Sequence, residues 1–139
     1  MSVQAIRRAL DERLATLTPS WPTAQENALY TPTLGTSYQR VALLPAQTEN
    51  VEVAGGGVVI AREQGIYQVS LYCRADAGAG VAATRADALR AHFQRGTVLS
   101  AAGVSVLIIR TPSVAPSMYD GDWYVVPVSV PYLANLFFT

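Results

Sequence analysis

In the segment of residues 66–74, the side chains from residue 67 onward alternate between an apolar and a more polar set, and this alternation constrains the fold more than any other feature of the sequence. The apolar positions are Tyr67, Val69, Leu71 and Cys73, and the positions between them are Gln68, Ser70, Tyr72 and Arg74. A period of two residues is that of a β-strand with one buried face. The chain therefore needs a sheet with a covered face, on which Cys73 is a buried thiol.

Two segments have the apolar spacing of helices that can cover such a face. The first spans residues 2–17 and is followed by Pro19, and the second spans residues 81–94 and is followed by Gly96. Apolar residues three or four apart form one stripe on a helix. In the second segment the stripe consists of Ala82, Ala86, Leu89 and Phe93. We expect both helices to pack on the sheet.

The remaining extended segments complete the sheet. They are residues 23–30, 38–44, 51–53 with 58–60, 66–74, 97–101 with 104–110, and 123–130. Pro127 has no backbone N–H, so the last of these strands is expected at a sheet edge or with a bulge. The predicted fold is one α+β domain over residues 1–139, with a mixed, mostly antiparallel sheet of about six strands and two main helices.

Three successive glycines form the tip of the hairpin between residues 51–53 and 58–60. Ordering three glycines costs much conformational entropy, so such a tip is often ordered by a neighbouring chain; a solvated loop without a role is the alternative. The C-terminal residues 131–139 are apolar and are expected to pack on their own domain or on another chain. The candidate interface with another chain consists of Glu49, Glu52, Val53, Gly55, Gly56, Gly57, Val58, Leu136, Phe137 and Phe138.

The composition excludes several kinds of chemistry. All ten basic residues are arginines, and the chain has one histidine, His92, and one cysteine, Cys73. Without lysine there is no P-loop and no Schiff base, and one cysteine allows neither an internal disulfide nor a Cys-rich zinc site. A formal net charge of zero argues against tight binding of nucleic acid. We predict no catalytic residue, no metal and no cofactor, and therefore no enzyme.

The sequence also predicts neither secretion nor membrane insertion. The first residues carry charges every few positions, and no apolar run approaches the about 18 residues of a membrane span. We expect a chain that is made in the cytoplasm and has no membrane partner.

A glycine pattern at residues 78–83 resembles a dinucleotide-binding turn between a strand and a helix. That fold needs an acidic residue about 20 positions later to hold the ribose, and none occurs between Asp87 and Asp120. We interpret Gly78 and Gly80 as a tight turn, and a small nucleotide-binding enzyme built on them is the alternative from another class. Asp120 and Asp122 are interpreted as turn residues.

The order of several short segments resembles the phage tail-terminator-like family over residues 1–133. These segments are AQENALYTP (24–32), YQRVALLPA (38–46), GIYQV (65–69), HFQRG (92–96) and VPVSVPY (126–132). Glu26 and Asn27 match the last two positions of the family's aromatic-Glu-Asn motif. Gln25 replaces the aromatic residue, for which Trp21 and Tyr30 are near enough to substitute.

The resemblance implies a structural virion protein of a long-tailed phage or prophage. Such a protein forms a hexameric ring on the last ring of the tail tube, stops tube polymerisation and offers a joining surface to the head–tail connector. It lies at the neck-proximal end of the tail, and DNA only passes through its lumen. A head-completion or adaptor protein of the neck is the alternative.

Two expectations about residues follow from this implied role. Residues 48–60 are expected to order on assembly against the adjacent subunit or the tube, with Glu49 and Glu52 giving a lumen that does not retain DNA. Arg7, Arg8 and Arg13 are expected to face solvent or the connector.

Overall fold

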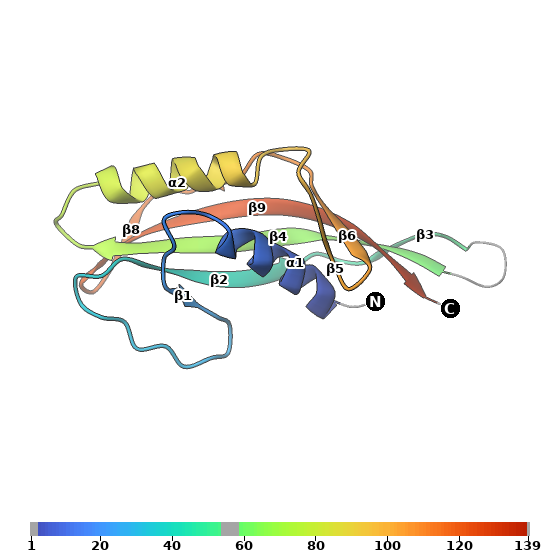
Figure 1. The fold of residues 1–139 in the computed structure, drawn as a ribbon, viewed down its shortest axis with the longest axis horizontal. Helices are drawn as coiled ribbons and strands as arrows, with labels where there is room; N and C mark the ends of the chain where they lie inside the picture. The colour runs from blue at the N-terminus through green and yellow to red at the C-terminus, as the bar shows by residue number, and fades with distance from the viewer. Residues whose placement is uncertain (1–2, 54–58, 139) are drawn as a thin grey trace.

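A computed structural model describes residues 3–53 and 59–138, and it contains one curled sheet and two helices (Figure 1). The elements in chain order are α1 (Val3–Ala15), β1 (Thr23–Ala24), β2 (Tyr38–Pro45), β3 (Glu49–Val53), β4 (Val59–Arg74), α2 (Gly80–His92), β5 (Val98–Ala101), β6 (Val104–Ile108), β7 (Ser113–Val114), β8 (Met118–Asp120) and β9 (Trp123–Phe138). The main path through the sheet has the strand order β1-β2-β4-β9-β6-β5, with β3, β7 and β8 paired beside it. The predicted α+β class is confirmed.

Two long strands form the centre of the sheet. β4 and β9 each have 16 residues and pair antiparallel over their whole length, from Val59 with Phe138 to Arg74 with Trp123. The other edge of β4 carries β2 and β3, and the other edge of β9 carries β6, β7 and β8. The two predicted strands at 58–60 and 66–74 are thus parts of one strand.

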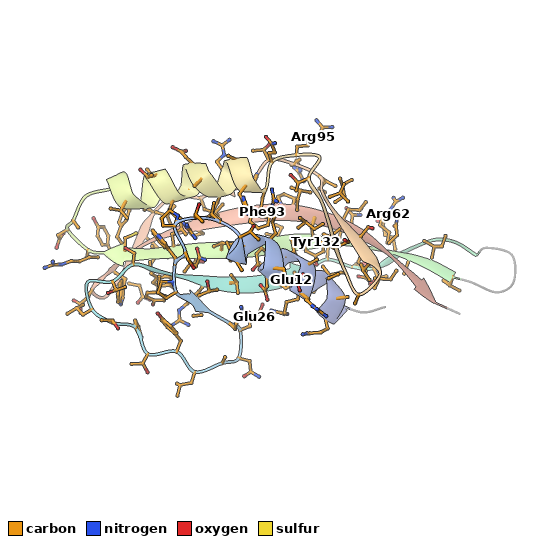
Figure 2. All side chains as sticks on the ribbon, viewed as in Figure 1. Glu12, Glu26, Arg62, Phe93, Arg95 and Tyr132 are labelled. Atoms are coloured by element: carbon orange, nitrogen blue, oxygen red, sulfur yellow. The ribbon has the colours of Figure 1, made fainter. Side chains whose placement is uncertain are left out.

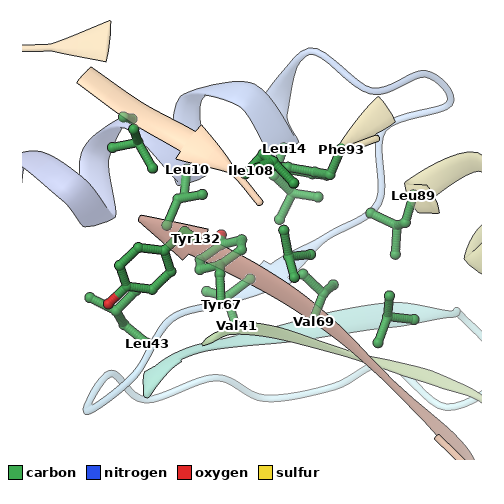
Figure 3. Packing of buried hydrophobic residues seen from close by; sticks show 14 of the residues in the cluster. Leu10, Leu14, Val41, Leu43, Tyr67, Val69, Leu89, Phe93, Ile108 and Tyr132 are labelled. Carbon is green, nitrogen blue, oxygen red and sulfur yellow. The ribbon is translucent and has the colours of Figure 1, made fainter. Parts of the chain in front are cut away.

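Both helices cover the same face of the sheet. Figure 3 shows Leu10 and Leu14 of α1 and Leu89 of α2 pointing toward the strand residues Tyr67 and Val69. The predicted stripe on α2 is confirmed, since all four of its residues are buried. The opposite face carries neither of the helices found in residues 3–53 and 59–138, and we call it the helix-free face.

The predicted strand at residues 23–30 is wrong beyond its first two residues. Only Thr23 and Ala24 pair with β2, and the chain then turns at Asn27, which has a φ of 52°. The next outward N–H of β2, that of Leu43, donates a hydrogen bond to the carboxylate of Glu26. A side chain therefore takes the place of a neighbouring strand at this edge.

The expectation for Pro127 is also wrong, because β9 lies inside the sheet and pairs with β4 without a bulge. The Pro127 oxygen accepts a hydrogen bond from the Ala115 N–H at 2.9 Å, so its backbone faces away from β4. On that side β7 and β8 are interrupted between residues 114 and 118. The missing N–H thus falls at a gap in the ladder, where no strand partner needs it.

Candidate assembly surfaces

The predicted interface residues gather on an arm built from the ends of three strands. β3, the first residues of β4 and the last residues of β9 pair with one another and extend beyond both helices (Figure 1). Val59 pairs with Val53 on one side and with Phe138 on the other. The structure therefore brings together the hairpin and the C-terminal segment, which are far apart in the sequence. Gly55, Gly56, Gly57 and Val58 lie outside the described residues.

The described side chains of the arm divide into an inner and an outer set. Leu136 is buried beside Ala61, so this part of the C-terminal segment packs on its own domain. Glu63 is also buried and accepts hydrogen bonds from the Thr48 hydroxyl at 2.9 and 3.0 Å. Glu49 is exposed, and its backbone pairs with that of Arg62. Of the predicted acidic pair, Glu49 is thus on the outside of the arm.

The three arginines expected to face a connector have different surroundings. Arg7 forms an ion pair with Glu26 at 3.3 Å. The guanidinium of Arg13 donates two hydrogen bonds, at 2.9 and 3.1 Å, to the His92 carbonyl at the end of α2. Arg8 is exposed and pairs with Glu12, one turn along the helix. Of these three arginines, Arg8 is the most exposed to solvent.

His92 holds the ends of the two helices together. Its Nε2 lies 2.7 Å from the Arg13 carbonyl oxygen and 2.9 Å from the Thr16 hydroxyl. Burial lowers the pKa of His92 and favours the neutral ring, whose N–H donates to the carbonyl. Burial likewise raises the pKa of the Cys73 thiol, as expected for an unreactive cysteine.

One comparison decides the family. The chain matches the phage tail terminator protein family over residues 5–132. It belongs to that family. The family makes the chain a structural protein of a phage tail, in the virion.

Solved structures agree with this fold. One matches 100% of this chain and 99% of its own with a TM-score of 0.75 and 26% sequence identity. No curated protein matches the chain. The helices within the described residues include none that is long and apolar enough to cross a membrane.

Two positions of the family-like Gly65–Val69 motif have clear structural roles. A Cβ on Gly65 would lie 2.5 Å from the Leu44 oxygen and 2.8 Å from the Tyr132 hydroxyl, so only glycine fits. Tyr67 is fully buried and its hydroxyl donates a hydrogen bond to Asp11 on α1. Burial raises the pKa of Tyr67, which keeps the donor proton in place. The motif thus attaches β4 to β2 and to α1.

The glycine turn before α2 has a structural explanation in this member of the tail terminator family. Gly78 has a φ of 90°, which explains the glycine as a turn residue. The nearby Arg85 is buried, with its guanidinium donating hydrogen bonds to the Pro19 carbonyl and the Gln39 side chain, and with the Trp21 ring 4.9 Å away. Its two terminal nitrogens are thus bonded within the fold, whereas its Nε is buried and has no hydrogen-bond partner among the described residues. Within residues 3–53 and 59–138, no three His, Cys, Asp or Glu residues are placed to hold a metal ion.

Proposed function

We propose that this protein caps the tail tube as a ring, stops tube polymerisation and presents the joining surface for the head–tail connector. The observation that carries the proposal is the arm of β3, β4 and β9, which reaches beyond the helix-covered body in a chain of the tail terminator family. An element that extends past its own core is suited to contact a neighbouring subunit. Six such subunits with two different faces each close a ring through heterologous contacts.

The arm is the part of the ring that meets the adjacent subunit or the tube. Glu49 is exposed on it, and its negative charge on a lumen surface would repel DNA and let it pass. Residues 48–60 are expected to gain hydrogen-exchange protection when the protein assembles. Equal protection of this segment in the free and the assembled protein would contradict this part of the proposal.

The capping activity is tested by mixing the purified protein with tube protein from the same tail. We expect a ring at one end of the tubes in electron micrographs and shorter tubes than without the protein. The same assay is run with Glu49→Arg, which reverses a charge on the arm. Asp87→Arg, which reverses a charge on the exposed side of α2, is its matched control. Unchanged tube length with the unmodified protein would rule out a terminator activity.

The connector surface is assigned to the exposed side of α1 around Arg8, because Arg7 and Arg13 are bound within the domain. Arg8→Glu is expected to reduce joining of heads to tails in a complementation assay while tubes are still capped. Glu12→Gln tests the neighbouring position and removes the ion-pair partner that Arg8 has within the described residues. Full joining with Arg8→Glu would remove the connector part of the proposal.

A further inference from the structure

A loop beside β2 carries two large apolar side chains that are mostly exposed to solvent. In residues 25–37, Leu29 is 99% exposed and Leu34 is 70% exposed. The loop is nevertheless held at several points, since Glu26 binds the Leu43 N–H and the Tyr30 ring lies 5.1 Å from the Tyr38 ring. The loop is thus anchored, and it exposes its leucines to solvent. Exposed apolar side chains in a fixed position indicate a contact with another protein.

A second exposed apolar set lies at the far edge of the sheet. Val98 of β5 is 65% exposed and pairs with Leu107 of β6, which is 36% exposed. Leu107 in turn pairs with Leu133 of β9. All three lie on the helix-free face, because their neighbours Val106 and Ala134 point into the core under the helices. We call Val98, Leu107 and Leu133 the edge patch.

The loop and the edge patch lie at opposite edges of the same sheet. The loop connects β1 to β2, at one end of the order β1-β2-β4-β9-β6-β5, and the edge patch begins on β5 at the other end. They cannot cover each other within one chain. Between two copies related by rotation they can meet, and the contact then repeats from copy to copy, which is the head-to-tail geometry that closes a ring.

The charges around the two surfaces are opposite in sign. Asp76 and Asp122 line a cleft of ≈ 430 Å³ together with Leu34, with Arg74 as the one basic residue there. At the other edge, Arg95 precedes β5 (Figure 2). Arg110 follows β6, and both arginines are exposed. Neither takes part in an ion pair within residues 3–53 and 59–138. Complementary charge at an interface guides the correct pairing of surfaces.

We propose that the loop of residues 25–37 docks on the edge patch of the next copy in the ring. Leu29 and Leu34 cover Val98 and Leu107, while the acidic cleft faces Arg95 and Arg110. This contact rests on the proposed ring and adds a contact between neighbouring copies to the one proposed for the arm. The occupant is a second copy because the chain itself carries both the apolar and the charged halves of the contact.

Cysteine cross-linking between separately purified variants tests the contact directly. Protein carrying Leu29→Cys is mixed with protein carrying Val98→Cys under conditions in which rings form, and the mixture is oxidised. We expect a disulfide-linked dimer that contains one chain of each kind. Leu29→Cys mixed with Val81→Cys is the matched control, since Val81 is exposed on α2 over the other face. Cys73 is buried and is present in every sample.

The possible outcomes separate the contact from the proposed function. Rings that form without the Leu29–Val98 cross-link, or with equal cross-linking to Val81, overturn the contact and leave the capping role standing. Failure to form rings, alone or on tubes, overturns the capping role and the contact with it. As a second measurement, the paired reversals Asp76→Arg with Asp122→Arg should abolish assembly. Adding Arg95→Glu with Arg110→Glu in the same chain should restore it, and no restoration contradicts the charge pairing.

Discussion

The two faces of the sheet are built from the same strands but are completed differently. On the helix-covered face, alternate residues of β4 such as Tyr67, Val69 and Leu71 are fully buried under α1 and α2. On the helix-free face, an aromatic group around Tyr38 is covered by the loop, while Val98 at the far edge stays exposed. The apolar residues of the first face are thus covered within a single chain, whereas the second face keeps exposed apolar surface that a partner can cover. Substitutions on the two faces should therefore affect different properties.

The largest contrast is expected between two leucines. Leu89 on α2 is fully buried in the core, and Leu89→Ala should lower the free energy of unfolding by about 2–5 kcal/mol. Leu29 is fully exposed, so Leu29→Ala should change it by less than about 0.5 kcal/mol. Urea denaturation of both variants measures the difference. Similar losses of stability in both would show that Leu29 is packed within its own chain.

Two adjacent residues of β4 give the next contrast. Gly65→Ala places a methyl group against the Leu44 carbonyl and should cost about 1–3 kcal/mol through overpacking. Ile66 is exposed on the helix-free face, and Ile66→Thr should lower the stability much less. Thermal denaturation compares them. A Gly65→Ala protein as stable as the unmodified one would mean that β2 can shift away from β4 without cost.

Local patterns in the sequence predict the helix-covered face well. The alternation in β4 and the stripe of Ala82, Ala86 and Leu89 each show which side of the element faces the core. In both cases the spacing of nearby residues is enough to predict that side. The β5–β6 hairpin is confirmed for the same reason, with its turn at Ala102 and Gly103, which both have positive φ.

The features that the sequence did not predict depend on partners far along the chain. Glu26 replaces a strand partner for Leu43, and Asp11 binds Tyr67 across 56 residues. The missing N–H of Pro127 predicts a sheet edge or a bulge, because the neighbouring residues do not reveal the gap between β7 and β8. The arm likewise joins β3 to the end of β9, a pairing that no local periodicity encodes. Such contacts are set by topology rather than by local propensity.

Two tyrosines of β4 allow the same kind of comparison for a hydrogen bond, because Tyr67 lies on the helix-covered face and Tyr72 on the helix-free face. Tyr67→Phe removes the hydrogen bond to the half-buried Asp11 and should cost about 1–3 kcal/mol, because the carboxylate loses its partner. Tyr72→Phe keeps a ring 4.7 Å from that of Tyr38 and should change stability by less than about 0.5 kcal/mol. Chemical denaturation of both variants measures the contrast. Equal effects would mean that the Tyr67–Asp11 hydrogen bond adds nothing to the attachment of α1.

The smallest expected effect concerns pH and the contact between the helix ends. Burial lowers the pKa of His92 in the folded protein below its usual value of 6.5; the hydrogen bond to the Arg13 carbonyl opposes this shift, and the positive charges of Arg13 and Arg85 add to it. Between the folded pKa and 6.5 the unfolded chain binds more protons, so stability rises with pH in this window and is lost as the pH falls through it. In the variant His92→Gln, the side chain at this position does not titrate, although its amide group can still donate a hydrogen bond to the Arg13 carbonyl. Denaturation curves between about pH 5 and 8 should therefore show the unmodified protein losing stability relative to His92→Gln only on the acid side. A constant difference across the range would mean that His92 does not change its charge on unfolding, and the helix contact would then be independent of pH.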